Sequence, residues 1–268
     1  MKSTSPGDIA RLLTGTPLII MLDIDGTLCD IVERADDAHV PSVVQDALRA
    51  LSGDAARDVR IAFVTGRSVA DASCMLGIES ATIYGNHGME RLSATGEIRL
   101  PDGWERDGAR LRAAVPEFSR LVEMFSGTSL EDKQFSLTLH HRAMDAALLP
   151  RFDAGAGEIA RRHDLRLAHG KCVINVLTSS GRTKGDAVLE FVRDSGGDAA
   201  GASILFAGDD VTDEDAFRAL RNLAGAVTVH VGAEPAGGAA AGSTCAQFSV
   251  GGPSDVHDLL SLMAAPSS

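Results

Sequence analysis

Residues 18–27 read Leu-Ile-Ile-Met-Leu-Asp-Ile-Asp-Gly-Thr, a short apolar run that ends at two carboxylates and a glycine. Five apolar residues bounded by a turn predict a strand that is buried on both faces of a parallel sheet. Asp23 and Asp25 then lie just beyond the carboxyl end of that strand, where open α/β sheets bind ligands. Because side chains alternate along an extended chain, we expect the two carboxylates to point in related directions.

The flanking segments alternate between helix and strand patterns. We predict a helix from Pro41 to about residue 53, a strand over 61–64, a helix over 68–76 and a strand over 82–84. The alternation returns after residue 183, with a helix to about 195, strands at 204–207 and 226–231, a helix after Asp213 and a last helix from Ser254. This order predicts an α/β fold with a doubly wound, mainly parallel sheet.

The segment 101–178 breaks this rhythm. Its pattern predicts a helix around 111–125, a strand with one polar face at 135–139, a helix over 143–162, and short strands at 166–168 and 172–177. We therefore expect an inserted α+β cap domain at 101–178 within a catalytic core made of 1–100 and 179–268. The Gly/Ala-rich stretch 233–243 is predicted to be a loop.

The amino-acid composition limits the kinds of molecule that we expect the protein to bind. The formal net charge is -12 and the cations are scattered, which excludes the basic footprint of a protein that binds nucleic acid or an anionic membrane. The four cysteines show no CxxC spacing, so we expect free thiols and neither a disulfide nor zinc. The first apolar run is too short for a signal sequence or a membrane span. We expect a cytoplasmic monomer that acts on a small molecule.

The two carboxylates suggest chemistry on phosphate. An ionised carboxylate is a workable nucleophile at neutral pH, but it repels a phosphate dianion unless a cation lies between them. The acidic run 208–214, at the end of another predicted strand, supplies ligands suited to Mg²⁺. Each acidic segment alone is also typical of a structural turn or of an acidic helix start.

Two further residues lie between these acidic segments and favour a functional site. Thr65 follows the second predicted strand and has a hydroxyl that can donate to a phosphate oxygen. Lys184 begins a predicted helix and can place a positive charge on the phosphate or on Asp23. At strand ends of one sheet, the four elements together form a far more specific pattern than any one of them.

This constellation resembles the haloacid dehalogenase superfamily of phosphatases, whose signature elements match Asp23 to Thr27, Thr65, Lys184 and Asp209-Asp210. The resemblance implies that Asp23 is the nucleophile, Asp25 the acid/base, and Thr65 and Lys184 the phosphate-handling residues. It also implies Mg²⁺ held by Asp23, the backbone carbonyl of Asp25 and Asp209, with support from Asp210 or Asp213.

The wider pattern resembles the trehalose-6-phosphate phosphatase family. The matching segments, in the family's order, are 23–28, 65–68, 85–90, 136–142, 170–171, 184–185 and 208–214. The resemblance implies hydrolysis of trehalose 6-phosphate to trehalose and phosphate, the last step of trehalose biosynthesis, with a cap that reads the sugar. The implied substrate contacts are Gly66, Arg67, Asn86 and His87 in the core and Glu131, Lys133, Arg142 and Lys171 in the cap. His87 is equally compatible with a tight structural turn.

One departure from the family pattern concerns the sugar site. After Gly170-Lys171 the family usually carries an acidic residue, whereas Asn175 stands here. An amide still hydrogen-bonds a hydroxyl, but without the charge-assisted strength of a carboxylate. This keeps open a phosphatase of another sugar phosphate, such as a sucrose, glucosylglycerate or hexose phosphate. A non-catalytic sugar-phosphate sensor is the alternative from another class, and the intact acidic residues and Lys184 argue against it.

Overall fold

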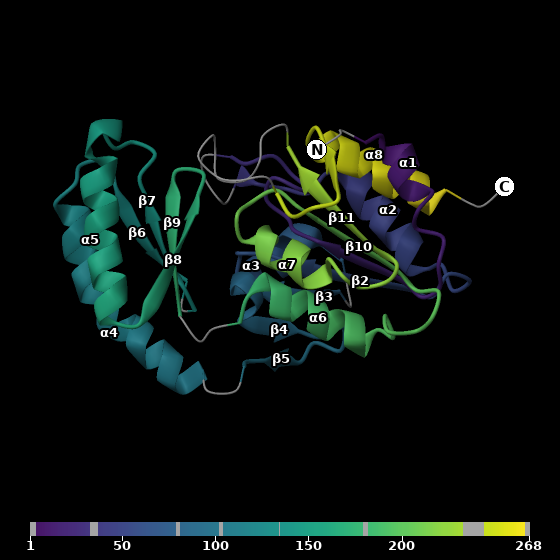
Figure 1. The fold of residues 1–268 in the computed structure, drawn as a ribbon, viewed down its shortest axis with the longest axis horizontal. Coiled ribbons are helices and arrows are strands. Elements are labelled where there is room, and N and C mark those ends of the chain that lie inside the picture. Colours follow the sequence, from purple (N-terminus) through teal and green to yellow (C-terminus); the bar gives the residue numbers. More distant parts are fainter. Residues whose placement is uncertain are drawn as a thin grey trace. The chain divides into compact units, whose positions relative to one another are not determined.

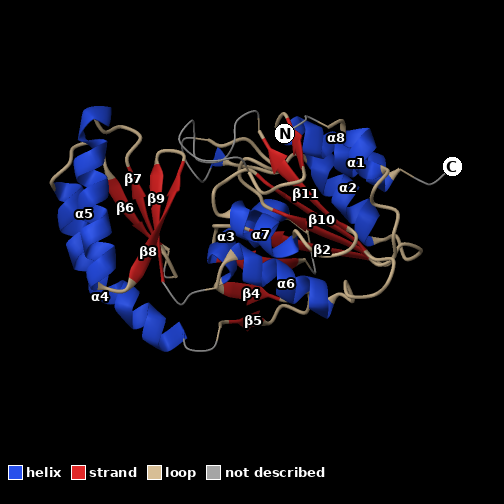
Figure 2. Ribbon diagram, viewed as in Figure 1, coloured by secondary structure: helices blue, strands red, loops and turns tan. Residues whose placement is uncertain are grey.

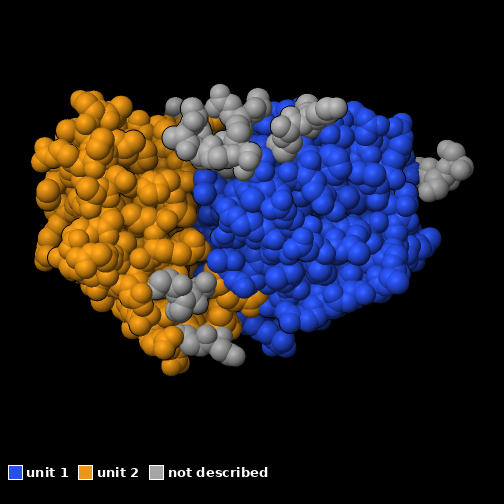
Figure 3. All heavy atoms as spheres, viewed as in Figure 1, with its two compact units in different colours: residues 1–99, 183–268 blue, residues 100–182 orange. Residues whose placement is uncertain are grey.

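The computed structural model describes residues 4–32, 37–78, 81–101, 104–133, 135–178, 182–232 and 244–265. The chain forms two compact units, one made of residues 1–99 and 183–268 and the other of residues 100–182 (Figure 3). Among the described residues, no helix is both long enough and apolar enough to cross a membrane. The four cysteines all lie in described segments and are free.

Unit 1 is built on an eight-stranded sheet in the order β12-β11-β10-β1-β2-β3-β4-β5 (Figures 1 and 2). The strands from β12 to β3 are parallel, and β4 and β5 are antiparallel additions at one edge. The mainly parallel core sheet is therefore confirmed. The bounds are β1 Leu18–Leu22, β2 Val59–Val64, β3 Thr82–Gly85, β4 Glu90–Leu92, β5 Ile98–Arg99, β10 Ser203–Gly208, β11 Ala226–Val231 and β12 Phe248–Val250.

Helices cover both faces of this sheet (Figure 2). The central strand β1 shows why its sequence is apolar throughout: Ile20 packs into one core cluster, while Ile19 and Met21 pack into the other. A strand buried on both faces carries no alternation, because each face needs apolar side chains. The helices are α1 Pro6–Ala10, α2 Ser42–Ser52, α3 Val69–Leu76 and α8 Pro253–Ala264 beside the first cluster, and α6 Lys184–Asp194 and α7 Asp213–Leu220 beside the second.

Unit 2 is a four-stranded antiparallel sheet, in the order β6-β7-β9-β8, with two helices on one face. Leu137, Leu139, Ile174 and Val176 alternate along β7 and β9 and pack against these helices, so the intervening residues Thr138 and Asn175 lie on the other face. The bounds are α4 Trp104–Glu123, β6 Ser129–Asp132, β7 Leu137–His140, α5 Leu149–Arg162, β8 Leu165–Gly170 and β9 Val173–Thr178.

The helix predicted over 143–162 is wrong at its start. A short 3₁₀ turn, η3 Ala146–Leu148, comes first, and the α-helix begins only at Leu149. Asp145 caps that turn by accepting a hydrogen bond from the Ala147 N–H at 3.0 Å, and Pro150 stands in the first turn of the helix. Proline favours that position because it has no N–H to leave unpaired there.

The strand predicted at 135–139 also begins later, at Leu137, because Lys133 N donates to Ser136 O at 3.0 Å and closes a turn before it. The sequence patterns missed four short strands (β4, β5, β6 and β12) and the five-residue helix α1. The predicted loop at 233–243 lies outside the described residues.

We predict that Ile20→Ala lowers the free energy of unfolding by about 2–5 kcal/mol, since it leaves a cavity in the centre of the sheet. Urea unfolding followed by circular dichroism measures this loss. The matched control is Val43→Ala on α2, where the side chain is 54% exposed and we expect a change within about 0.5 kcal/mol. A loss below about 1 kcal/mol for Ile20→Ala would contradict the placement of β1.

Candidate active site

Three carboxylates meet at the carboxyl edge of the core sheet. Asp23 follows β1, Asp209 follows β10, and Asp213 opens α7. One oxygen from each lies within 4.8 Å of the others. Because β1 and β10 are adjacent and parallel, with Leu22 opposite Ala207, the residues that follow each strand emerge side by side. Asp23 N continues the pairing by donating to Ala207 O at 3.0 Å.

Two glycines permit this close approach. Gly26 has a φ of +79°, and a Cβ there would lie 2.1 Å from Asp209 Oδ2. A Cβ on Gly208 would lie 2.3 Å from the carboxyl carbon of Asp213. Any larger residue at either position would push a carboxylate out of the cluster, so the glycines are part of the site.

Lys184 lies inside the acidic cluster, at the first turn of α6. Its Nζ lies 3.0 Å from Asp23 Oδ1 and 2.8 Å from Asp213 Oδ1, and its side chain is only 2% exposed. Thr183 fixes the start of the helix through a capping box with Asp186. Burial lowers the pKa of Lys184, but the charges of Asp213 and Asp23 outweigh this and raise it, so the ammonium form is kept.

Asp213 also holds the loop before α7, because its Oδ2 accepts a hydrogen bond from Asp210 N at 2.9 Å. The sequence suggested Asp213 only as a possible support for metal ligands. The direct contact with Lys184 was missed, although the position of Asp213 four residues after Asp209 at a helix start was an available signal. Asp210 contributes its backbone N–H here.

The cluster carries more negative charge than one lysine neutralises. Burial is the main reason that the pKa of Asp23 rises to about 8 and that of Asp209 to about 9, and the neighbouring carboxylates add to it. Asp209 Oδ1 is buried and has no hydrogen-bond partner among the described residues. A hard, oxygen-liganded cation would pair this atom and relieve the repulsion, so the residues present fit a Mg²⁺-type ion.

Thr65 lies at the end of β2, the other neighbour of β1, and is 1% exposed. Its main chain is tied on both sides: Thr65 N donates to Tyr84 O, and Thr65 O accepts from His87 N, both at 2.9 Å. Its Oγ1 accepts from Arg67 N at 3.2 Å, which leaves the hydroxyl hydrogen to be donated. This placement suits the predicted contact with a phosphate oxygen.

Asn86 and His87 form a strained turn, η2 Asn86–Gly88, over the loop that contains Thr65. Their φ angles are +48° and +60°, in the left-handed region that residues other than glycine rarely adopt. Asn86 is fully buried, and its amide donates to the Glu90 carboxylate. The His87 ring lies so close to Gly66 that a Cβ there would be 2.7 Å from His87 Cε1.

These contacts bear on three of the predicted substrate contacts. The Asn86 side chain is buried and its amide nitrogen donates to Glu90, so it helps to hold the turn; its contact with substrate stays a prediction. His87 is 6% exposed and packs on Gly66, which is compatible with the structural alternative for His87; the substrate contacts of His87 and Gly66 stay predictions.

Arg67 is directed at Asp25. Its Nε donates to Asp25 Oδ2 and its Nη2 donates to Asp25 Oδ1, each at 2.6 Å. This is the two-bond fork that arginine forms with carboxylates. The sequence suggested Arg67 as a contact for substrate and gave no signal for this partner, which lies 42 residues away along the chain.

The predicted sugar-reading residues of unit 2 fall into two groups. Glu131 and Asn175 form one row with Thr138, which stands between them on β7, on the face of the sheet away from the helices. Arg142 and Lys171 are exposed and lie in the loops after β7 and β8, and Lys133 is partly exposed and follows β6.

The row has its own hydrogen bonds. Thr138 Oγ1 donates to Asn175 Oδ1 at 3.0 Å, and Glu131 Oε2 lies 2.8 Å from His140 Nε2 and 3.9 Å from Lys133 Nζ. Thr138 and His140 are partners that the sequence did not single out, although the alternation of polar residues along β7 was visible.

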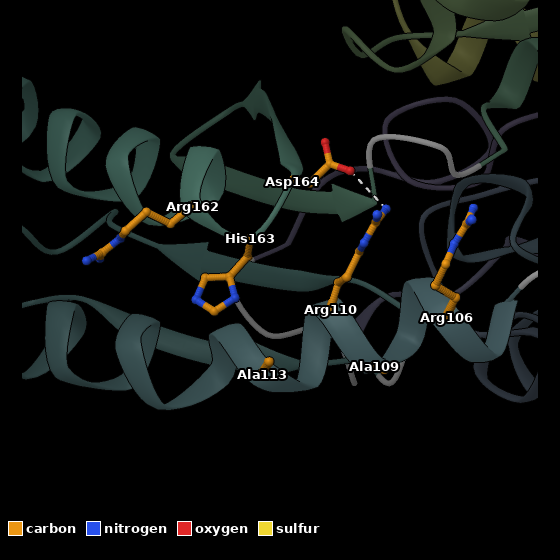
Figure 4. Close-up of a pocket in the computed structure, with 7 residues that line it drawn as sticks. All are labelled: Arg106, Ala109, Arg110, Ala113, Arg162, His163 and Asp164. Carbon is orange, nitrogen blue, oxygen red and sulfur yellow. Dashed lines mark ion pairs between the residues drawn. The ribbon is translucent and has the colours of Figure 1, made fainter.

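A hollow of about 480 Å³ on unit 2 lies apart from these residues, between α4 and the end of α5 (Figure 4). Arg106 and Arg110 extend to the same side of α4, and Arg110 pairs with Asp164 at 2.9 Å (Figure 4). Nearby, Glu117 lies 2.5 Å from Arg162 and 2.8 Å from His163, and the His163 hydrogen bond lowers the pKa of Glu117. The cations that line this hollow are paired with acidic residues of the same unit, and these ion pairs connect α4 to the end of α5. The hollow is therefore a poor site for phosphate.

We predict that Gly26→Ala lowers the affinity for Mg²⁺ by at least about tenfold, because the new methyl group displaces the Asp209 carboxylate. Isothermal titration calorimetry measures the affinity. Gly96→Ala is the matched control: its φ is +84°, so it suffers the same backbone strain, but nothing lies within 4 Å of its Cβ. Equal Mg²⁺ affinity in the two variants would show that Asp209 is not a ligand.

Comparison with known proteins gives a family for this site. A family model described as trehalose-phosphatase matches residues 21–247. Probable trehalose-phosphate phosphatase 9 of Oryza sativa subsp. japonica is 31% identical over 278 residues, which span 94% of this chain and 71% of that protein. An uncharacterized glycosyl hydrolase of Mycobacterium tuberculosis is 30% identical over 224 residues, spanning 80% of this chain but only 16% of its own length.

The solved structures agree on the fold. The C-terminal domain of C. albicans trehalose-6-phosphate phosphatase superposes with a TM-score of 0.80 at 22% identity, covering 98% of this chain and 97% of that one. A sugar phosphatase of haloacid dehalogenase (HAD) subclass IIB, 14% identical, superposes with a TM-score of 0.57 and covers 90% of this chain and 96% of that one, so the two share a fold. With the family model covering both acidic segments, Thr65 and Lys184, the chain belongs to the trehalose-phosphatase family.

Proposed function

We propose that this protein hydrolyses trehalose 6-phosphate to trehalose and phosphate through an aspartyl-phosphate on Asp23. The observation that carries the proposal is the buried contact of Lys184 with Asp23, at 3.0 Å, beside Asp209 and Asp213. Membership of the trehalose-phosphatase family supports the substrate.

The positions of the groups support the following reaction. Asp23 attacks phosphorus, the bond from phosphorus to the sugar oxygen breaks, and that oxygen takes the pair of electrons and a proton from Asp25. Water then attacks phosphorus, gives its proton back to Asp25, and releases the Asp23 carboxylate and phosphate. Lys184 holds the attacking carboxylate in place, and Thr65 donates a hydrogen bond to a phosphate oxygen.

Asp23, Asp209 and the backbone carbonyl of Asp25 would hold Mg²⁺. When bound, the ion would offset the repulsion between the carboxylate and the phosphate dianion and stabilise charge on the phosphoryl oxygens. Asp213 does not need to be a ligand, because both of its oxygens are engaged, one by Lys184 and one by Asp210 N.

We further propose that unit 2 is the cap and that its polar row reads the sugar hydroxyls. Glu131 and Asn175 supply the row, while Lys133, Arg142 and Lys171 supply positive charge from the surrounding loops. Cap residues of this kind decide the sugar, and the core groups decide the reaction. We expect the protein to work as a cytoplasmic monomer.

A second candidate is a phosphatase of another sugar phosphate. It is favoured by one observation, the amide of Asn175 bonded to Thr138 where the family usually places an acidic residue. A sensor without catalysis fits less well, since the complete cluster around Lys184 costs stability that recognition alone would not require.

A phosphate-release panel tests the substrate. We expect trehalose 6-phosphate to be hydrolysed with a kcat/KM at least about tenfold above those for sucrose, glucosylglycerate and glucose phosphates, which corresponds to about 1.4 kcal/mol of discrimination. Activity should disappear with EDTA and return with Mg²⁺. Equal rates across the panel would support the second candidate.

The nucleophile has its own test. Asp23→Asn should abolish turnover, and Asp25→Asn should lower kcat by about 10²–10⁴-fold, the usual contribution of acid–base catalysis. The matched control is Asp46→Asn, where the carboxylate is 74% exposed and we expect unchanged rates. A folded Asp23→Asn protein that still turned over, with contamination excluded by mass spectrometry, would refute the mechanism.

A further inference from the structure

We propose that Arg67 is a positioning residue for the acid/base: its guanidinium orients the Asp25 carboxylate toward the leaving oxygen and does not bind the phosphate of the substrate. The proposal rests on the proposed phosphatase function and adds a role that the family comparisons do not assign.

The geometry of the pair is that of a rigid clamp. Two hydrogen bonds of 2.6 Å connect Nε and Nη2 of Arg67 to the two oxygens of Asp25. Two parallel bonds fix the plane of a carboxylate, whereas a single bond would let it rotate. The Arg67 side chain is 13% exposed and that of Asp25 is 35% exposed, so the clamp is shielded while the carboxylate stays accessible.

The main chain of Arg67 is fixed as well. Arg67 N donates to Thr65 Oγ1 at 3.2 Å, and Arg67 O accepts from Asn86 N at 2.7 Å. A Cβ on Gly85 would lie 2.9 Å from Arg67 O, so the strand that follows packs directly on this loop. The strained turn at Asn86 and His87 therefore holds Arg67 in place, and Arg67 orients Asp25. Backbone strain of this kind is typical of segments that position functional groups.

Asp25 has Arg67 as its side-chain partner. It lies in the turn after β1, between Asp23 and Gly26, and it is outside the group of three carboxylates around Lys184. A carboxylate offers about four lone-pair positions, and the fork of Arg67 uses one on each oxygen. Each oxygen therefore keeps a position from which it can pass a proton to the leaving oxygen or accept one from water.

The Nε–Nη2 edge of the guanidinium, one of the edges that could chelate two phosphate oxygens, is occupied by Asp25. This is the reason to separate a positioning role from the substrate contact suggested by the sequence.

Kinetics with two leaving groups test the proposal. The sugar oxygen is a poor leaving group and needs a proton, whereas the oxygen of p-nitrophenyl phosphate leaves without one. We expect Arg67→Gln to lower kcat for trehalose 6-phosphate by about 10²-fold and for p-nitrophenyl phosphate by less than about fivefold, with KM nearly unchanged for both, as for Asp25→Asn. Arg67→Lys should rescue little, because an ammonium cannot form the fork.

A double variant supplies the decisive comparison. If Arg67 acts through Asp25, Arg67→Gln combined with Asp25→Asn should be no slower than Asp25→Asn alone. Losses that multiply, or a raised KM for both esters, would overturn the proposal and make Arg67 a phosphate ligand. An equal fall in kcat for both esters, together with a lower melting temperature, would overturn it in favour of a purely structural role.

Two controls keep the result separate from the proposed function. Arg60→Gln removes a half-exposed arginine that pairs with Asp58 at 2.7 Å, and we expect unchanged kinetics. Wild-type protein that hydrolyses p-nitrophenyl phosphate and another sugar phosphate, but not trehalose 6-phosphate, would refute the substrate and leave the comparison of leaving groups intact. Wild-type protein that hydrolyses no ester would refute both.

Discussion

The buried ammonium of Lys184 is the charge on which the rest of the site depends. A lysine at the start of a helix faces the positive end of the helix dipole, and a fully buried charge costs several kcal/mol unless it is paired. Asp23 and Asp213, whose oxygens lie 3.0 and 2.8 Å from Lys184 Nζ, offset both the unfavourable helix dipole and the cost of burying the charge. Conversely, the same carboxylates could not lie so close together without Lys184. Lys184 and the two carboxylates therefore stabilise each other, and they are brought together from the end of β1 and the starts of α6 and α7.

The pairing of β1 with β10 turns this electrostatic requirement into a position in the fold. With Leu22 opposite Ala207, Asp23 and Gly208 occupy the next level of the sheet, and Asp209 follows immediately. Glycine at 208 leaves room for Asp213, and glycine at 26 leaves room for Asp209. The acidic first turn of α7 then lies at the positive end of that helix, where carboxylates are favoured. The three carboxylates are therefore placed by the register of β1 and β10, by the lack of a side chain at Gly26 and Gly208, and by the start of α7.

The parts of the molecule that could be predicted are those with local signals. The strand bounds 18–22 and 226–231 follow directly from uninterrupted apolar runs, and the motif residues follow from their places at strand ends. Short edge strands such as β5, with two residues, carry too little pattern to be read. The 3₁₀ turn before α5 was hidden because a helical pattern does not show where a side-chain cap interrupts it. The ion-pair partner of a charged side chain, such as Arg67 for Asp25, depends on which loops the sheet brings together. The local pattern of one sequence does not show which loops these are.

The polar face of the sheet in unit 2 shows how the residue at one position changes the hydrogen bonds that a row of side chains can form. In the row formed by Glu131, Thr138 and Asn175, the Thr138 hydroxyl donates to Asn175 Oδ1 at 3.0 Å. That bond uses one of the two lone pairs of the amide oxygen, so Asn175 can still offer one lone pair and its two N–H donors. A carboxylate in the same place would offer only acceptors. The row therefore combines acceptors at Glu131 with an amide at Asn175 that can both donate and accept, whereas a carboxylate at position 175 would, under the proposed function, bind only the hydrogen of a sugar hydroxyl.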